Sequence, residues 1–177
     1  MSKAKILLLG AAVVGLLLFS ASAFASPRRK ATKRPADLDG IPLDGRRLTD
    51  GEVAYLLAWA GWSGEDLEDA VRIVLGESGG NPQAINVNRG AKGKYKDSVD
   101  RGLWQFNNVA FPDLSEEAAF DVQLSTERAY KVWKKVGWKP WRAGATETHT
   151  KHKVGGKWVT DTALISRAKK AAATLAA

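Results

Sequence analysis

The sequence predicts a mainly helical α+β fold with a small β-region between the helices. Apolar residues recur at helical spacing in three stretches, over residues 49–61, 63–78 and 121–136. Residues 83–99, which are rich in Asn, Gly and Lys, show little periodicity, and this indicates a long loop or a weak β-hairpin. With 177 residues, 45% of them apolar, and seven Trp, the chain has enough material for the core of one domain.

The first predicted helix begins at Thr49. Thr49 and Glu52 have the spacing of a capping box, in which each side chain accepts a hydrogen bond from the backbone N–H of the other residue. Gly61 is expected to end this helix. The apolar stripe between these points consists of Val53, Leu56, Leu57 and Ala60.

The second predicted helix begins with Ser63 as its N-cap, followed by acidic residues that suit the positive end of a helix dipole. Gly79 and Gly80 are expected to end it, and the Asn-Pro pair that follows prevents its continuation. Further along the chain, we expect a short helical turn over residues 115–119 and a longer helix over 121–136.

The chain is expected to divide into four segments. Residues 1–25 are predicted to be a signal peptide, because lysines precede an apolar run that ends in Ala-x-Ala, or a membrane anchor, because the run is long enough to span a bilayer. Residues 26–48 are predicted to be a linker. Residues 49–145 form the expected globular domain, and residues 146–177 a basic C-terminal tail that is helix-prone but weakly apolar.

Cysteine and histidine, two of the common metal ligands, are scarce in this chain. There is no cysteine, which excludes disulfides and thiolate metal sites. The two histidines, His149 and His152, have no partners in a metal-binding pattern, and we expect both to be exposed. We therefore expect neither a metal nor a cofactor.

Glu77 is the strongest candidate for a catalytic residue. It ends an apolar helical stretch, where the carboxyl is expected to lose water on one side and to lie close to the negative end of the helix dipole. Both effects favour the protonated form, and a protonated carboxyl can act as a general acid. Glutamates near helix ends are ordinarily solvated surface residues, so this assignment depends on the neighbouring motifs.

Two motifs together resemble a known family. The first is Glu-Ser-Gly-Gly-Asn-Pro at residues 77–82, and the second is Gly-Leu-Trp-Gln-Phe-Asn at residues 102–107. With these motifs the chain resembles the lysozyme superfamily, above all the lytic transglycosylases and phage-type lysozymes, over about residues 49–145. The resemblance implies a lysozyme-like fold, and the fold prediction depends on it more than on periodicity.

By this resemblance Glu77 is the catalytic acid, while Gln105 and Asn107 line the cleft that holds a sugar chain. Asp100 resembles an Asp of animal-type lysozymes that serves as nucleophile or electrostatic stabiliser. Here Arg101 stands where those proteins have an aromatic residue, so a turn role or an ion pair with Arg101 is the alternative. Many lytic transglycosylases work without this carboxylate, using the glutamate as acid and then as base.

Three further residues are candidates for substrate binding. Ser78 can hydrogen bond to the Glu77 carboxyl or cap the helix end. Trp138 and Trp141 follow a helix stop, and an indole ring can stack on a sugar, although core packing is expected for most of the tryptophans. The Gly-Trp-x-Pro-Trp segment at 137–141 resembles phage-type members, whereas the Ala-Tyr-Asn segment of the transglycosylases is missing.

The predicted function is cleavage of the β-1,4 bond between N-acetylmuramic acid and N-acetylglucosamine, by a muramidase or lytic transglycosylase acting on peptidoglycan glycan strands. The location expected for it is the periplasm, the extracellular space or a membrane-anchored position facing the wall. Residues 6–25 would provide any membrane association.

Two other classes of function are alternatives. One is a non-catalytic glycan-binding protein of the same fold. The other is a basic protein that binds nucleic acid or a membrane surface, which the excess of 27 basic over 19 acidic residues would suit. The glycosidase prediction instead assigns the net charge of +8 to attraction by an acidic wall and expects no nucleic acid partner.

Overall fold

The structure is a computed structural model that describes residues 41, 45–141, 151–154 and 157–175. The expected signal peptide or anchor and most of the expected linker lie outside these residues, as does His149, and of His152 only the backbone is described. Among the helices that are described, none has both the length and the apolar character needed to cross a bilayer.

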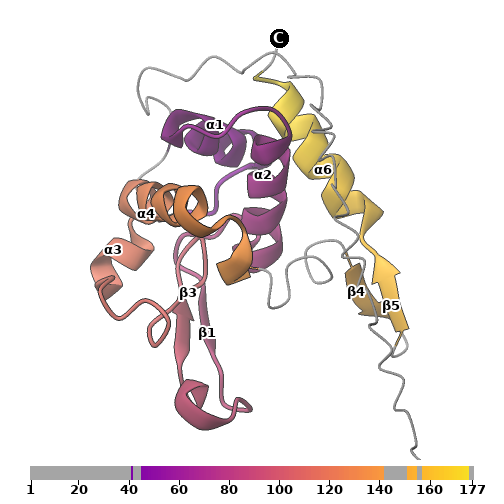
Figure 1. Cartoon of the computed structure of the whole chain (residues 1–177). Helices are drawn as coiled ribbons and strands as arrows, with labels where there is room; N and C mark the ends of the chain where they lie inside the picture. The colour runs from indigo at the N-terminus through magenta and orange to yellow at the C-terminus, as the bar shows by residue number, and fades with distance from the viewer. Residues whose placement is uncertain (1–40, 42–44, 142–150, 155–156, 176–177) are drawn as a thin grey trace, which may run out of the picture.

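A helical body carries a small projecting sheet (Figure 1), which confirms the mainly helical α+β class. The helices that precede residue 142 are α1 (Asp50–Ala60), α2 (Gly64–Ser78), α3 (Glu116–Phe120) and α4 (Val122–Val136). The strands β1 (Ile85–Val87), β2 (Val99–Arg101) and β3 (Phe106–Asn107) form an antiparallel sheet in the order β1-β2-β3. The short 3-10 helices are η1 (Gly93–Tyr95) at the far end of the hairpin and η2 (Lys139–Trp141) after α4.

Helix α1 begins and ends as its sequence predicts. The Thr49 hydroxyl accepts from the Glu52 N–H at 3.3 Å, and the Glu52 carboxylate accepts from the Thr49 N–H at 2.7 Å. Gly61 ends the helix at φ 121°, a conformation that suits a glycine. Ser63 stands at the N-cap of α2, but its side chain makes no capping hydrogen bond, so the expectation of a side-chain cap there is wrong.

The capping box of α1 is extended by Arg46. Its guanidinium donates to both oxygens of Glu52, at 2.6 and 3.1 Å. These hydrogen bonds are the main cause that lowers the pKa of Glu52 from its ordinary 4.5 to about 2. Because the charged form is preferred in the folded protein, this carboxylate stabilises the fold above pH 4.5, and its contribution is lost as the pH falls toward 2.

We therefore expect Glu52→Gln to flatten the acid limb of the stability curve. Urea unfolding should show a smaller loss of stability between pH 4.5 and 2 in the variant than in the wild type. The difference should be on the order of 1 kcal/mol, since Arg46 is half exposed and water screens the pair. Arg46→Ala should flatten the same range, because it removes the main donor. Identical slopes in the wild type and both variants would contradict this account.

The turn after α2 is tied to the segment before α1. Gly79 ends α2 in the left-handed conformation, with φ 61°, as predicted. Gly80 follows at φ 80°, where an added Cβ would lie 2.7 Å from the Leu48 carbonyl oxygen. The Leu48 N–H in turn donates to the Gly80 carbonyl at 2.8 Å, and Leu48 is buried, as is Ile41. The prediction of a linker up to residue 48 is therefore wrong at its C-terminal end.

Residues 83–99 adopt the hairpin alternative. Strand β1 pairs with β2 so that Asn86 lies opposite Asp100, and β2 pairs with β3 so that Asp100 lies opposite Asn107. The short helix α3 and the longer α4 also occur where they were predicted, with Ser115 and Asp121 as side-chain N-caps.

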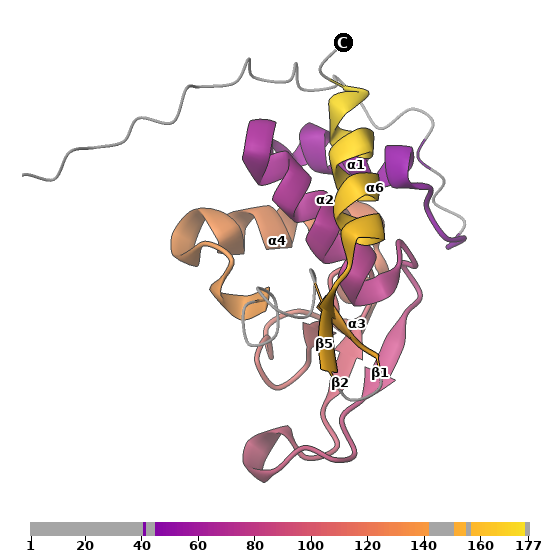
Figure 2. The ribbon, with the colours of Figure 1, turned by 90° about the vertical axis from the view of Figure 1, so that its right-hand side faces the viewer.

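The expected C-terminal tail contains ordered structure that belongs to the helical body. Strands β4 (Lys151–Val154) and β5 (Lys157–Thr160) form a hairpin, and α6 (Thr162–Ala173) packs against α1 and α2 (Figure 2). Its buried stripe consists of Leu164, Ala168, Ala171 and Ala172. Alanines let helices approach closely, so a weakly apolar helix can still dock, and describing this stretch as a tail is wrong.

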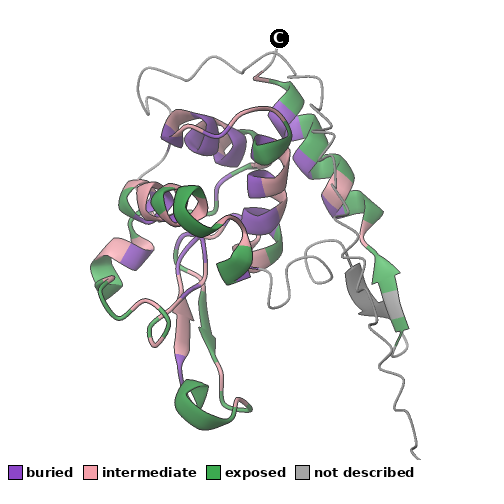
Figure 3. Cartoon of the chain, in the orientation of Figure 1, coloured by how far each residue is buried: buried purple, intermediate pink, exposed green. Residues whose placement is uncertain are grey.

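An aromatic cluster forms one part of the core. The ring of Trp62, which is 1% exposed, contacts Trp104, Tyr130, Trp133 and Trp138, with centroids 4.9 to 6.0 Å apart. Figure 3 shows the buried residues on the facing sides of the helices, while the tip of the β1–β2 hairpin is exposed. This packing holds the connection between α1 and α2, the turn between β2 and β3, and helix α4 together.

Candidate functional site

Glu77 lies in the last turn of α2, where it is half-buried. Residues 79–84 connect this turn directly to β1, so the carboxyl stands at the junction between the helix and the sheet. The neighbouring Ser78 hydroxyl donates to the Val74 carbonyl at 3.1 Å, four residues back in the helix. Its hydrogen is therefore committed to the helix, while its oxygen lone pairs can still accept a hydrogen bond.

Arg47 closes the end of the helix that carries Glu77. Its guanidinium donates to the Gly79 carbonyl at 2.7 Å, where the carbonyl groups of the last turn need donors. An added Cβ at Gly79 would collide with this guanidinium. Arg47 lies in the predicted linker, and no pattern in the sequence connects it to the end of α2, so it was not predicted as part of the site.

Asp100 is held by three asparagine side chains on one face of the sheet. Its Oδ1 accepts from Asn107 at 2.7 Å, and its Oδ2 accepts from Asn88 at 2.9 Å and from Asn86 at 3.1 Å. Asn86, Asp100 and Asn107 are direct cross-strand neighbours, so the register of the sheet brings them together. We call these four residues, with Ser98, the Asp100 cluster.

Every amide N–H in the Asp100 cluster has a partner. Ser98, which is 2% exposed, accepts from Asn88 at 3.2 Å and from Asn107 at 2.9 Å, and Asn86 donates to Asn88 at 3.3 Å. The side-chain oxygen of Asn107, Oδ1, accepts from two backbone N–H groups of the following turn. Asn107 thus positions Asp100, and a direct contact between its amide and a sugar requires one of these bonds to be exchanged.

The alternative roles considered for Asp100 do not fit its surroundings. Successive side chains of a strand point to opposite faces, and Arg101 accordingly pairs with Glu116 at 3.2 Å instead of with Asp100. Asp100 lies within β2 and not in a turn. The hydrogen bonds from the three asparagines therefore hold the Asp100 side chain in its position.

Gln105 occupies a strained turn between β2 and β3. Its φ is 49°, which is uncommon for a residue other than glycine. Its side-chain amide donates to the carbonyls of Gly102 at 3.0 Å and Ala84 at 3.2 Å, which ties this turn to the start of β1. Both N–H groups are thereby used, so the carbonyl oxygen is the atom of this side chain left for a ligand.

The two candidate tryptophans after α4 have different environments. Trp141 is 6% exposed, and its indole N–H donates to the Trp104 carbonyl at 3.1 Å. The structure therefore assigns Trp141 to the core, which corrects the expectation that it contacts a sugar. Trp138 is half-buried and stacks on Trp62 with centroids 6.0 Å apart, so part of its surface is accessible.

Asn86, Asn88 and Ser98 were not singled out in the sequence, although a signal for them exists. Residues 85–88 alternate between apolar and polar side chains, as expected for a strand with one polar face, and Ser98 and Asp100 have the same two-residue spacing. Recognising the hairpin as two strands would have placed these side chains on the face of Asp100. The exact register, which decides their contacts, needed the structure.

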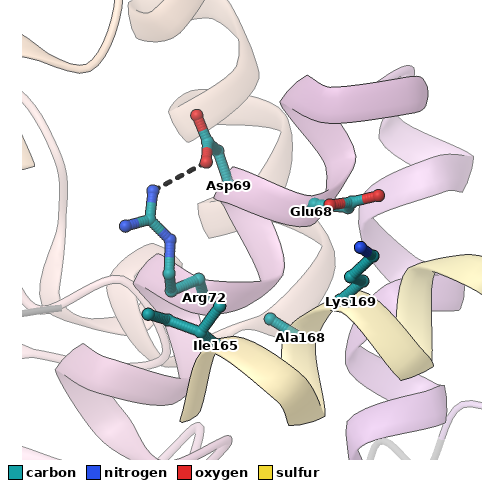
Figure 4. A pocket seen from close by; sticks show the side chains of 6 residues that line it. All are labelled: Glu68, Asp69, Arg72, Ile165, Ala168 and Lys169. Atoms are coloured by element: carbon teal, nitrogen blue, oxygen red, sulfur yellow. Dashed lines mark hydrogen bonds and ion pairs between the residues drawn. The ribbon is translucent and has the colours of Figure 1, made fainter. Parts of the chain in front are cut away.

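Two pockets lie away from these residues. One, of about 280 Å³, is located between α2 and α6, and its lining includes Glu68, Asp69, Arg72 and Lys169 (Figure 4). Asp69 and Arg72 form an ion pair at 2.6 Å, and Glu68 and Lys169 reach toward the same opening from the two helices. The two acidic and two basic side chains of this pocket balance each other, so its charge does not favour a ligand of either sign. The other pocket, of about 360 Å³, runs along α4.

Comparison with known proteins identifies one family. A family model described as a lysozyme-like domain matches residues 54–143, which lie within the domain predicted over 49–145. No curated protein and no solved structure matches the chain.

Proposed function

Because the chain belongs to the lysozyme-like domain family, we propose that it cleaves the β-1,4 bond between N-acetylmuramic acid and N-acetylglucosamine in peptidoglycan. Membership of the lysozyme superfamily and the mainly helical α+β fold are both confirmed. The family is glycan-active, and its members generally act on peptidoglycan. The choice of bond and the roles of the individual residues are our proposal.

The observations that carry the proposal are a carboxyl in the last turn of α2, from which the chain runs into β1, and a second carboxyl on β2, the strand that pairs with β1. Glu77 ends the helix, and Asp100 is held by three asparagines on the strand that pairs with β1. Glycoside cleavage needs a proton donor for the leaving oxygen and stabilisation of an oxocarbenium-like centre. Two carboxyl groups on separate elements suit these two tasks.

In the proposed reaction, Glu77 transfers its proton to the glycosidic oxygen while the bond from that oxygen to the anomeric carbon breaks. Asp100 stabilises the positive charge that develops at this carbon. A water molecule, or the 6-hydroxyl of the muramoyl residue, then bonds to the anomeric carbon and returns a proton to Glu77. The first nucleophile gives hydrolysis and the second gives an anhydro sugar.

The location of the protein follows as part of the same proposal. Peptidoglycan lies outside the cytoplasm, and residues 1–25 have the composition of an export signal or an anchor. We propose that the protein is exported and meets its substrate in the periplasm, outside the cell or at the membrane surface. Detection of the mature N-terminus by mass spectrometry of the secreted protein tests this step.

The experiment that tests the function is mass spectrometry of peptidoglycan digested with the full chain. The proposal predicts soluble fragments that end at muramic acid, with reducing ends after hydrolysis or anhydro ends after transglycosylation. The two products differ by the mass of one water molecule, so one measurement identifies both the bond and the nucleophile. Intact peptidoglycan after prolonged incubation, or fragments that end at N-acetylglucosamine, would contradict the proposal.

We expect Asp100→Asn to lower the rate of glycan cleavage about 100-fold, because it removes the negative charge opposite the developing cation. The amide keeps one oxygen that can accept from Asn86 and Asn88 but turns a donor toward Asn107, so the variant should lose some stability, and its rate is measured where urea unfolding shows it fully folded. The control is Asp97→Asn, an exposed carboxyl at the hairpin tip. A cleavage rate within twofold of the wild type would mean that Glu77 acts without Asp100.

A further inference from the structure

The pocket along α4 combines a cationic rim with an apolar floor. Its volume of about 360 Å³ lies within the range of sites that bind small ligands. Its cations are Arg128, Lys131 and Lys135, and its apolar lining includes Phe111, Val136 and Pro140. A ligand that fits this lining carries negative charge together with small apolar groups.

The three cations lie on one face of α4. Arg128, Lys131 and Lys135 follow each other at three and four residues, which places them along one side of a helix. Arg128 donates to Asp113 at 2.6 Å, while its buried Nε makes no hydrogen bond within the described part of the chain. Lys131 and Lys135 are exposed, and neither forms an ion pair with a described carboxylate. The rim therefore has an excess of positive charge.

The pocket starts beside the sheet that carries the Asp100 cluster. The Phe111 N–H donates to the backbone carbonyl of Asn107 at 2.9 Å. The Phe111 ring packs on the Phe106 ring, with centroids 4.8 Å apart. Asn107 lies in β3, an edge strand of the sheet, so the chain passes from the Asp100 cluster to the pocket within four residues. A substituent on a glycan strand bound at the cluster has to pass over this edge to reach Phe111, which packs beside Phe106 on the other face of the sheet.

We propose that the α4 pocket binds the acidic stem peptide of peptidoglycan. This identification rests on the proposed function, because the muramic acid of that polymer carries short peptides with free carboxylates and alanine methyl groups. The carboxylates complement Lys131, Lys135 and Arg128, and the methyl groups suit the apolar floor. A polymer of polyol phosphates complements the charge but has no apolar groups for Phe111 and Val136.

The test is a titration of the full chain with the free tetrapeptide N-acetyl-L-Ala-γ-D-Glu-L-Lys-D-Ala by isothermal calorimetry. The wild type should bind it saturably, and the double variant K131A/K135A should bind it about tenfold more weakly or worse, because two charge-assisted contacts are lost. The matched control K92A/K96A removes two exposed lysines from the hairpin and should retain the wild-type affinity. A peptide with amidated carboxyl groups should bind the wild type as weakly as the acidic tetrapeptide binds the double variant.

Three results would overturn the assignment. The first is no saturable binding of the tetrapeptide to the wild type, and the second is equal affinity in the wild type and K131A/K135A. The third is binding of polyglycerol phosphate in place of the peptide, which would identify a phosphodiester ligand. Alanine at positions 131 and 135 favours helix and both side chains are exposed, so the double variant should fold.

Cleavage assays separate this proposal from the proposed function. On intact peptidoglycan, K131A/K135A should raise KM, whereas on glycan stripped of peptides by an amidase it should match the wild type. Peptide binding without glycan cleavage would contradict the proposed function alone. An unchanged KM on both substrates would contradict the stem-peptide proposal alone.

Discussion

Glu77→Gln should lower the rate of peptidoglycan cleavage by about 100- to 10,000-fold, the range that removal of a general acid typically gives. The amide has nearly the shape of the carboxyl but cannot give a proton to the leaving oxygen. The last turn of α2 should remain intact, because its end is fixed by Gly79 and by the hydrogen bond from Arg47 to the Gly79 carbonyl. The measurement is turbidity loss of a cell-wall suspension, together with a pull-down of the variant on insoluble peptidoglycan.

The same experiment separates the three classes of function. Loss of clearing with retained wall binding supports the glycosidase, while wall binding by a wild type that never clears the wall supports a non-catalytic glycan-binding protein. Salt-sensitive binding of DNA or anionic vesicles, without wall binding, would support the third class. Glu65→Gln is the matched control, since it changes an exposed glutamate in the first turn of the same helix. Equal clearing by Glu77→Gln and the wild type would exclude Glu77 as the acid.

The helix ends of the fold could be predicted because each depends on a few neighbouring residues. Thr49 and Glu52 determine the start of α1 through two local hydrogen bonds, and Gly79 ends α2 because glycine accepts a left-handed backbone. Ser63 shows the limit of such rules, since the residue stands at the predicted N-cap without making the bond. A side-chain rotamer depends on contacts that local sequence does not contain.

Contacts between distant segments were the part that sequence could not supply. Helix α6 docks through alanines against α1 and α2, and its exposed Arg167 pairs with Asp50 of α1 at 2.6 Å across 117 positions of sequence. Alanines carry little signal of burial, because they also occur on exposed helices. The prediction of a tail failed for this reason.

The part of the candidate site that lies within the two sequence motifs could be predicted. The motifs identified Glu77 and Asn107, and the two-residue periodicity of a strand separates Asp100 from Arg101. The cross-strand register, which brings Asn86 and Asn107 to either side of Asp100, depends on the turn geometry and on the packing of the sheet. The hydrogen-bond partners of Asp100 therefore came from the structure alone.

Trp104→Ala should destabilise the protein by about 3 to 5 kcal/mol, the cost of removing a large aromatic side chain from a core. Trp104 is 0% exposed, and its ring contacts Trp62 at 5.3 Å and Trp141 at 5.2 Å. Its indole N–H donates to the Thr126 hydroxyl at 3.1 Å, a partner that the variant leaves buried. Since whole domains are stable by only about 5 to 15 kcal/mol, urea unfolding should place this variant close to the limit of folding.

Two further variants test the assignment of Trp104 to the core. Trp104→Phe keeps a ring but loses the bond to Thr126, so it should cost less than the alanine variant. Tyr95→Ala removes an exposed aromatic ring at the hairpin tip and should change stability by about 0.5 kcal/mol or less. If Trp104→Ala were no more destabilising than Tyr95→Ala, Trp104 would not be a core residue. With the expected order of effects, any loss of activity in Trp104→Ala follows the fraction of unfolded protein, whereas Glu77→Gln loses activity in a fully folded chain.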